Sequence, residues 1–391
     1  MNASFDVVIV GGGVTGAAVG YGLAKRGVKT CLVDAVPTFS RASRANMGLI
    51  WCQSKALGCP QFVRWGFASS RAYGKLAAEL KELSGIDTGY APTGGIIPCL
   101  GEAELEARAQ FIEKLRVETE DGTYPASVLS RKELEGMLPK VPFGPEVSGG
   151  IWSDMDGYVD PLHLMFAFRK SFVRLGGTLF AGERVSEVKP SGKGYAVVCG
   201  GRTLECGKAV LAAGLGVRKL AAQLGTDIPV FPNKSQVMLL ERIPADVLPI
   251  PLLGIARTFG GTVMIGAAHE NMGMDRRLTP EVLAANAQWA VRVWPELERK
   301  RILRFWTGLR VWPKDAYPIY DRIPGHENAF VFAMHSAVSL AAILEQALPD
   351  YVMGKPLPPD GAIFGLSRFA GGGSGFQGSA ASSPHAEAPN K

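Results

Sequence analysis

The stretch Phe5-Asp6-Val7-Val8-Ile9-Val10 runs directly into Gly11-Gly12-Gly13-Val14-Thr15-Gly16, and the next apolar run, Thr30-Cys31-Leu32-Val33, ends in Asp34. This order predicts a strand, a glycine turn, a helix over residues 17–26 and a second strand that ends in an acid. Gly11 permits the tight turn, Gly13 lets backbone N–H groups approach a pyrophosphate, and Gly16 lets the helix pack on the strand. Asp34 is then placed to bind a ribose hydroxyl. The pattern predicts a dinucleotide site, with a glycine-rich turn that binds nothing as the alternative.

Length and charge agree with a large protein that binds small anionic molecules. The chain has 391 residues, of which 47% are hydrophobic and 20% are charged. One hydrophobic core usually stops growing at about 250–300 residues, so two domains are expected. The net charge is only +6, and the 42 Lys and Arg residues are scattered along the sequence. This distribution argues against a nucleic-acid surface and fits mild attraction of anionic ligands.

Neither a secretory signal nor a transmembrane segment is expected. The first apolar run is short and is already explained as a strand. No segment reaches the roughly 18 uninterrupted apolar residues of a spanning helix. The six cysteines form no CxxC pair and no metal-finger spacing. They indicate reduced thiols in a cytoplasmic protein without a zinc or iron–sulfur site of its own.

The segment between residues 40 and 148 looks like an insertion that covers a site. A polar loop over residues 40–48 precedes an expected helix over residues 64–84, and a charged amphipathic helix is expected over residues 102–118. Ser130 and Glu133 have the spacing of a capping box, with Ser130 as the N-cap of another helix.

From Gly149 the alternation of strands and helices resumes. It predicts a helix over residues 162–175, a strand over 182–188, and a strand over 208–213 that breaks at Gly214. This second glycine turn is either a close backbone approach to a cofactor or an ordinary strand–helix turn. Later elements are expected as strands between 230 and 265 and over 329–333, and as helices over 280–294 and 339–352. Gly, Ser, Ala and Pro dominate from Ala370, so residues 370–391 are expected to form a disordered tail.

Six motifs, in this order, give the chain a resemblance to a known family. After the first glycine turn come Ser43-Arg44-Ala45-Asn46-Met47-Gly48, Asp156-Gly157-Tyr158-Val159-Asp160-Pro161, Leu211-Ala212-Ala213-Gly214, Gly308-Leu309-Arg310 and Met334-His335-Ser336-Ala337-Val338-Ser339-Leu340. Over nearly all of residues 5–369 the chain resembles the D-amino-acid oxidase-like superfamily of FAD-dependent oxidoreductases. The branch is that of glycine and sarcosine oxidases, with D-amino-acid dehydrogenases and opine oxidase catalytic subunits. Residues 43–53 and 64–83 are most similar to D-hydroxyproline dehydrogenases, whose usual substrate is cis-4-hydroxy-D-proline.

The resemblance implies an α/β (α+β) fold with two domains. The first is a Rossmann-like FAD-binding domain of the GR2 type, expected over residues 1–84, 149–222 and 300–369. The second is an inserted antiparallel-sheet domain that binds substrate, expected over residues 85–148 and 223–299.

The resemblance also assigns the residues that contact FAD along its length. From the nucleotide end to the flavin end they are Gly11, Gly13, Val14, Thr15, Gly16, Asp34, Val185, Ala213, Gly214, Ser43, Arg44, Asn46, Met47, Gly48, Gly308, Arg310, His335, Ser336, Ala337, Val338, Ser339 and Leu340. No Cys follows Cys206 and no His lies in residues 40–48, where some relatives attach their flavin covalently. The FAD is therefore expected to be non-covalent.

Three residues are expected to act on the substrate side. Arg310 occupies the family's Gly-x-Arg position, where the guanidinium binds an α-carboxylate through two parallel bonds; an arginine at the surface or in an ion pair is the alternative. His335 is assigned to the flavin and His269 to the substrate pocket, each with a structural or surface position as the alternative. After Arg310, Val311-Trp312-Pro313 departs from the family pattern, which implies a changed pocket mouth.

Three functions remain open at this point. The first is oxidation of a D-amino or D-imino acid, above all cis-4-hydroxy-D-proline or D-proline, by hydride transfer from the α-carbon to flavin N5. The second is an oxidase or dehydrogenase of another secondary amine, such as an opine, sarcosine or glycine, with oxygen as acceptor. The third is a non-catalytic flavin-fold subunit. Ferredoxin-like or second flavoprotein subunits are the other expected electron acceptors.

Overall fold

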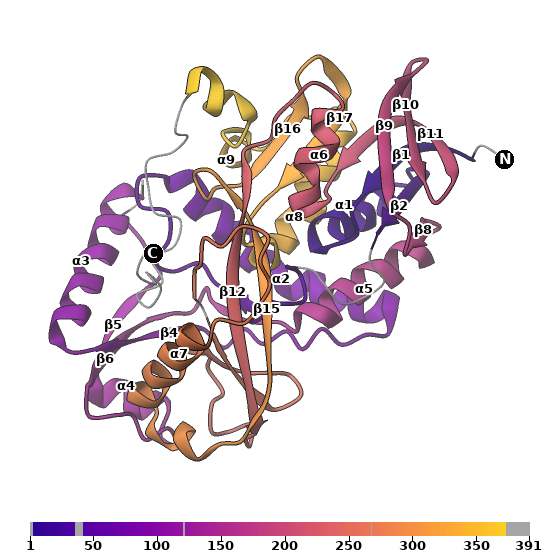
Figure 1. Ribbon diagram of the computed structural model, residues 1–391. Helices are drawn as coiled ribbons and strands as arrows, with labels where there is room; N and C mark the ends of the chain where they lie inside the picture. Colours follow the sequence, from indigo (N-terminus) through magenta and orange to yellow (C-terminus); the bar gives the residue numbers. More distant parts are fainter. Residues whose placement is uncertain (1–2, 36–41, 120–121, 267, 373–391) are drawn as a thin grey trace.

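A large mixed sheet forms one half of the molecule (Figure 1). The computed structural model describes residues 3–35, 42–119, 122–266 and 268–372. The strands of this sheet are β1 (Ala3–Val10), β2 (Thr30–Asp34), β8 (Thr178–Ala181), β9 (Val185–Ser191), β10 (Gly194–Cys199), β11 (Arg202–Leu211), β16 (Ile319–Ile323) and β17 (His326–Ala333). The order β17-β11-β1-β2-β8 is parallel, and β9, β10 and β16 add antiparallel pairs. The predicted first and second strands therefore lie side by side in its centre.

Helices cover one face of this sheet, and the other face is also buried. The helices packed on one another over it are α1 (Val14–Lys25), α2 (Pro60–Ser84), α5 (Pro161–Arg174) and α8 (Ala337–Val352). Side chains alternate along a strand, so Val7 and Ile9 of β1 face these helices. Val8 and Val10 face a second cluster, together with α6 (Val217–Ala222) and β10. Burial on both faces explains why the β1 sequence is an unbroken apolar run.

Antiparallel sheets form the other half of the molecule (Figure 1). One has the order β13-β14-β12-β15 and another the order β4-β6-β5. Their strands are β12 (Val230–Arg242), β13 (Ile255–Arg257), β14 (Thr262–Gly266), β15 (Ile302–Pro313), β4 (Gly95–Leu100), β5 (Ser127–Ser130) and β6 (Val147–Ser153). The remaining elements are β3 (Leu49–Ile50), β7 (Gly157–Tyr158), α3 (Glu102–Glu118), α4 (Arg131–Met137), α7 (Pro280–Val293), α9 (Pro359–Ala362) and 3-10 helices at Gly214–Gly216, Pro295–Arg299 and Leu366–Gly372.

Local sequence signals located several elements well and others with a shift. The helix expected over residues 102–118 is α3, and the capping box at Ser130 and Glu133 is present: Ser130 N donates to Glu133 Oε2 at 2.8 Å, and Glu133 N donates to Ser130 Oγ at 3.3 Å. Helix α2 begins at Pro60 rather than residue 64, because proline suits the first helical position. The strand expected from residue 182 begins at Val185, since Gly182 has a φ of +87° and forms a turn.

Two expected domain boundaries divide strands that the structure keeps together. The boundary at residue 149 cuts β6, which pairs with β4 from Gly95 to Leu100. The boundary at residue 300 separates β15 from β12, although the two strands pair along almost their whole length. The backbone hydrogen bonds of paired strands belong to one sheet. We therefore propose that the substrate domain comprises residues 85–153 and 223–313, which moves Arg310 into it.

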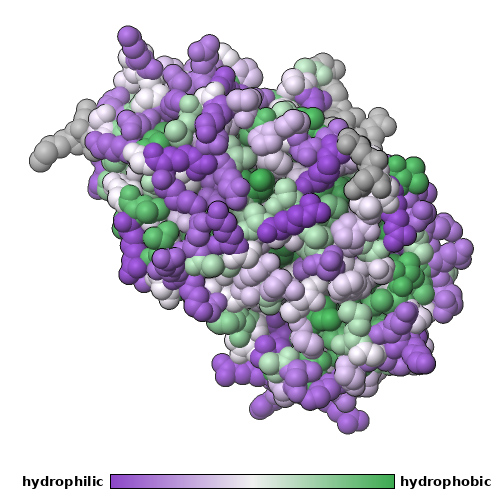
Figure 2. Space-filling view, turned by 180° about the vertical axis from the view of Figure 1, so that it is seen from behind, coloured by the Kyte–Doolittle hydropathy of each residue, from purple (hydrophilic) through white to green (hydrophobic). Residues whose placement is uncertain are grey.

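Several expectations about the surface and the chain ends can be compared with the structure. Residues 370–372, expected in the tail, end the 3-10 helix Leu366–Gly372, and residues 373–391 lie outside the described residues. All six cysteines are free and buried. In the described part of the chain, no helix is long and apolar enough to cross a membrane. The same residues contain no His, Cys, Asp and Glu group that could hold a metal ion. Figure 2 shows a face on which hydrophilic side chains predominate, with apolar patches between them.

Candidate active site

A cavity of about 940 Å³ lies where the two halves meet. It is lined by the carboxyl ends of β1, β2, β11 and β17, the starts of α1 and α8, residues 42–55, and the facing parts of β12 and β15. Open α/β sheets bind ligands outside the carboxyl ends of their parallel strands. The volume is at the upper end of the roughly 300–1,000 Å³ of ligand pockets, which suits an extended dinucleotide.

The first glycine turn forms one wall of the cavity. Gly11 has a φ of +108°, and a Cβ there would overlap Ala212, so the turn requires glycine. A Cβ at Gly16 would overlap the Gly11 carbonyl oxygen, which explains the close packing of α1 on the turn. At Gly13 a Cβ would meet only Ser43 Oγ, at 3.0 Å, and Gly13 lines the cavity. A ligand phosphate can therefore approach the backbone at Gly13, as predicted for a dinucleotide.

Asp34 ends β2 and lines the cavity next to this turn. Its Oδ2 accepts hydrogen bonds from Gly12 N at 2.8 Å and from Arg169 Nη2 at 2.7 Å. Arg169 comes from α5 and is only 6% exposed. Sequence reasoning missed this arginine, although a charged residue after the apolar run Phe166-Ala167-Phe168 was a signal. Arg169 fixes the orientation of the carboxylate that faces the ligand.

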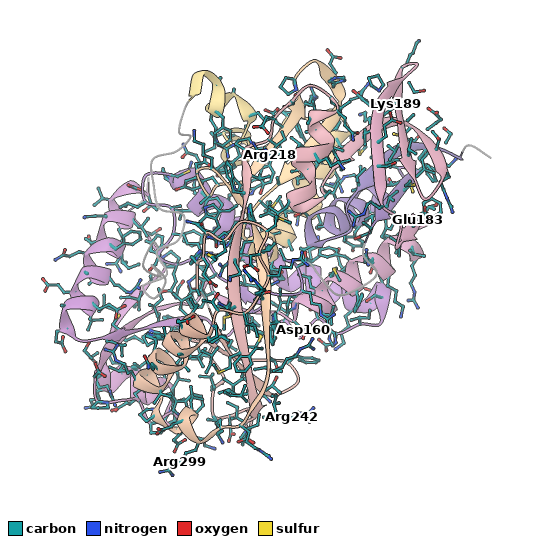
Figure 3. All side chains as sticks on the ribbon, in the orientation of Figure 1. Asp160, Glu183, Lys189, Arg218, Arg242 and Arg299 are labelled. Atoms are coloured by element: carbon teal, nitrogen blue, oxygen red, sulfur yellow. The ribbon has the colours of Figure 1, made fainter. Side chains whose placement is uncertain are left out.

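The nucleotide end of the cavity continues along β9 and β11. Val185 lines it, with Glu183 just before β9, and Glu183 is labelled in Figure 3. Glu183 is paired with Arg202 at 3.1 Å. Ala213 and Gly214 line the cavity where β11 ends, and Gly214 has a φ of +59°. The second glycine turn is thus at the cavity rather than elsewhere on the sheet.

The loop expected at the flavin is built around Asn46. Its Nδ2 donates to the carbonyl oxygens of Ala42 (3.0 Å) and Ser43 (2.8 Å), and its Oδ1 accepts from Gly48 N at 2.8 Å. Ser43 Oγ accepts from Val14 N at 3.0 Å, which ties the loop to the start of α1. Ser43, Asn46 and Met47 line the cavity together with Val14 and Thr15.

The start of α8 and strand β15 supply the opposite wall. His335, Ser336, Ala337, Val338 and Ser339 line the cavity, so the partial positive charge of the helix N-terminus faces it. Gly308 also lines it, and a Cβ there would lie 2.5 Å from Ala45 Cβ. Four residues of the expected set lie outside the lining: Gly16, Arg44, Gly48 and Leu340. Gly16 and Gly48 are closely packed against backbone, and Leu340 is buried in the core, so these three shape the site indirectly.

Arg310 lines the cavity from β15, and its described partners are neutral. Nη1 donates to Asn233 Oδ1 at 2.9 Å and to the Ala268 carbonyl oxygen at 2.8 Å, and Nη2 donates to Ser235 Oγ at 2.7 Å. Burial lowers the pKa of the guanidinium to about 10, and Glu270 opposes the shift. These bonds hold the fork in one orientation and leave its charge without a contacting carboxylate. The group is therefore suited to bind the carboxylate of a ligand.

His269 and His335 both line the cavity, as expected, on the two sides of Trp312. Their ring centroids lie 5.2 Å and 4.6 Å from the Trp312 ring. Burial, aided by Arg310, lowers the pKa of His269 to about 3. Burial, aided by Lys55, Arg310 and His269, lowers the pKa of His335 well below its usual value. Both rings are therefore neutral at pH 7, and neither holds a proton there.

Sequence reasoning missed the lining residues that follow Trp51. Gln53, Ser54 and Lys55 face the same cavity as Arg310. Gln53 is fully buried, and its Oε1 has no hydrogen-bond partner among the described residues. A buried acceptor without a partner is suited to a ligand N–H group.

Comparisons with known proteins agree with this geometry. The protein-family model described as FAD dependent oxidoreductase matches residues 6–344. One of the two opine oxidase subunits of Agrobacterium tumefaciens (strain Ach5) is 33% identical over 365 residues, which cover 93% of this chain and 97% of that protein. The crystal structure of glycine oxidase from Geobacillus kaustophilus is similar with a TM-score of 0.86 and 27% identity, over 94% of this chain and 99% of that one. L-proline dehydrogenase from P. horikoshii shares the fold, with a TM-score of 0.82 at 21% identity over 95% and 100% of the chains.

Proposed function

Because this chain belongs to the FAD dependent oxidoreductase family, we propose that it oxidises the C–N bond of an amino or imino acid whose α-carboxylate binds to Arg310. The observation that carries the proposal is the Arg310 guanidinium, which is held by neutral partners at the cavity. At one end of that cavity lie Gly13 and Asp34, which would hold the nucleotide half of FAD. Residues 42–47 and 335–339 would hold the flavin half. Bound there, FAD supplies the acceptor for a hydride from the substrate α-carbon.

The residues of the chain orient the substrate rather than react with it. The Arg310 fork would accept both carboxylate oxygens in one plane, which fixes the direction of the α C–H bond. His269 and His335 contribute no charge beside that carboxylate, because the pKa of each ring is lowered. The third expected function, a non-catalytic subunit, would leave this orienting arrangement without a use.

For the substrate we favour cis-4-hydroxy-D-proline or D-proline. The support is the resemblance of residues 43–53 to D-hydroxyproline dehydrogenases, since most of this segment lines the cavity beside Arg310. An opine is the second candidate, and the 33% identity to the opine oxidase relative favours it. Sarcosine and glycine follow, because glycine oxidase is a relative.

Deuterium at the α-carbon tests the reaction. With cis-4-hydroxy-D-proline carrying deuterium at C2, the anaerobic loss of the oxidised flavin absorbance should be several times slower than with the unlabelled compound. The α C–H bond breaks in the step that reduces the flavin, which is the physical reason. Equal rates with both compounds, or faster reduction by an opine, would contradict the favoured substrate.

The electron acceptor follows from a different observation. We propose that a ferredoxin-like or second flavoprotein subunit receives the electrons, and the opine oxidase relative, which is itself a subunit of a larger enzyme, supports a partner. Oxygen is the alternative acceptor, in keeping with the glycine oxidase relative. Peroxide release in air by the isolated chain at the rate of substrate oxidation would favour oxygen. Action in the cytoplasm stays a prediction from the sequence.

We further propose that the FAD is bound non-covalently. No cysteine is found among the described residues that line the cavity, and residues 42–48 contain no histidine. Acid precipitation should therefore release all of the flavin into the supernatant. Yellow colour that remains on the washed polypeptide would contradict the proposal.

A further inference from the structure

Lys55 lies in the segment after β3 and lines the cavity that Arg310 also lines. Its Nζ donates a hydrogen bond to the carbonyl oxygen of Trp51 at 3.0 Å, a neutral partner. Burial lowers the pKa of the ammonium, while Cys52 and Asp156 oppose the shift. The surroundings thus favour the neutral amine, which has a lone pair to offer.

The backbone on both sides of Lys55 has an unusual conformation. Ser54 has a φ of +53° and Ala56 a φ of +66°. Residues with a side chain rarely adopt this left-handed region, and here two of them flank one lysine. Such conformations persist where the surrounding structure fixes them, and they gather at functional sites.

Buried groups beneath the loop fix this conformation. Asp156 accepts hydrogen bonds from Cys52 N at 2.5 Å and from Gln53 Nε2 at 2.7 Å. Tyr124 accepts one from Ser54 N at 3.1 Å. Burial raises the pKa of the Asp156 carboxyl to about 7, and the bonds from Cys52 and Gln53 oppose that shift. The loop is therefore held from below, and Lys55 is held at the cavity.

The remaining neighbours of Lys55 carry little charge. Phe62 and Val63 of α2 and Ser336 and Ser339 of α8 line a small pocket with it. His335 is close enough for its pKa to be lowered by Lys55, and that ring is neutral. Asp156 and Cys52 are thus the groups on which a proton taken up by Lys55 would depend.

The proposed reaction requires a group that takes up a proton. A substrate amine is protonated in neutral solution, and its nitrogen needs a lone pair before the α-carbon can lose hydride. Among the described lining residues, Asp34 and Glu183 are paired with arginines at the nucleotide end. His269 and His335 have lowered pKa values, and Lys219 lies exposed on α6. Lys55 is the lining group near Arg310 that can accept a proton.

We propose that Lys55 is the base that removes the proton from the substrate ammonium before hydride transfer. This inference rests on the proposed function. The N–H bond breaks, the proton goes to the neutral Nζ, and the electron pair stays on the substrate nitrogen. When the α C–H bond then breaks, its electron pair leaves as hydride to the oxidised flavin, and the nitrogen pair forms the C=N bond. Lys55 returns the proton to solvent before the next turnover.

Two substitutions separate this role from simple charge. Lys55→Met removes the base, and Lys55→Arg keeps a cation that cannot give up its proton at ordinary pH. The rate constant of anaerobic flavin reduction is measured at saturating cis-4-hydroxy-D-proline, or at the candidate amine that reduces the wild type fastest. Near neutral pH both variants should be slower by about 100-fold or more. Exposed Lys193→Met, in the turn after β9, should match the wild type.

The pH dependence identifies the base directly. In the wild type the rate should rise with pH as Lys55 loses its proton, around a pKa below that of an ordinary lysine. In both variants the rise should move to higher pH, to the pKa of the substrate amine itself, so that the rates approach the wild type in alkali. A lysine with a merely structural role would lower the rate equally at every pH.

Binding of an unreactive ligand gives a readout that does not depend on turnover. Tetrahydrofuran-2-carboxylate keeps the ring and the carboxylate but carries oxygen in place of the amine. Its dissociation constant, followed by the flavin spectrum, should be the same in wild type and Lys55→Met. Weaker binding in Lys55→Met that Lys55→Arg restores would show an anion anchor and overturn the inference, as would an unchanged pH profile. If no candidate amine reduces the wild-type flavin, the proposed function fails, and this inference fails with it.

Discussion

Replacement of Arg310 with methionine is expected to weaken substrate binding by about 100-fold or more. A hydrogen bond to a charged group contributes about 1.5–3 kcal/mol, and truncating one partner of a buried charge pair costs about 2–5 kcal/mol. A loss of about 3 kcal/mol corresponds to about 100-fold, since each 1.4 kcal/mol is tenfold. The measurement is the dissociation constant obtained from the concentration dependence of anaerobic flavin reduction.

Two further variants separate the fork from the charge and from the strand. Arg310→Lys keeps the charge but loses the planar pair of donors, so its affinity should fall between those of the wild type and Arg310→Met. Arg304→Met changes an exposed arginine of the same strand and should leave the dissociation constant unchanged. D-Prolinamide, which lacks the carboxylate, should discriminate poorly between wild type and Arg310→Met. Equal loss of D-proline and D-prolinamide binding would instead indicate a folding defect.

Substitution of Gly16 with alanine is expected to abolish FAD binding and to destabilise the fold. The added Cβ would overlap the carbonyl oxygen of Gly11, which belongs to the backbone and cannot rotate away. Helix α1 must then move from β1, and the pyrophosphate cradle at Gly13 moves with it. Overpacking of this kind costs about 3 kcal/mol. Urea unfolding and the ratio of flavin to protein absorbance measure the two effects.

Gly20→Ala is the matched control on the same helix. There the added Cβ would lie 3.4 Å from the side chains of Ile9 and Leu32, an ordinary contact. Because alanine favours a helix over glycine by about 1 kcal/mol, the free energy of unfolding should stay equal or rise. A Gly16→Ala protein that keeps its FAD and matches Gly20→Ala in stability would contradict the packing argument.

Local sequence signals predicted the parts of the site that local structure determines. The glycine turn needs only the residues from Phe5 to Gly16, and Asp34 follows from the length of one strand–helix–strand unit. Arg310 was located by a three-residue motif and lines the cavity as expected. Each of these features depends on neighbours close in sequence, or on a motif that the family shares.

Features that depend on distant partners were missed. Arg169 meets Asp34 across 135 residues of sequence, and no local pattern links the two. Lys55 owes its position to Asp156 and Tyr124, so its sequence neighbours gave no signal. The domain boundary at residue 300 was wrong for the same reason, since β15 is defined by its pairing with β12. Strand pairing and buried polar contacts are properties of the fold, which local patterns do not contain.

The most direct test of FAD-dependent amine oxidation is the visible spectrum of the purified protein, recorded anaerobically before and after addition of cis-4-hydroxy-D-proline. Loss of the oxidised flavin bands at the rate of substrate binding and turnover is the predicted result. Bands that persist with this compound, D-proline, an opine, sarcosine and glycine, yet disappear with dithionite, would contradict the proposed function.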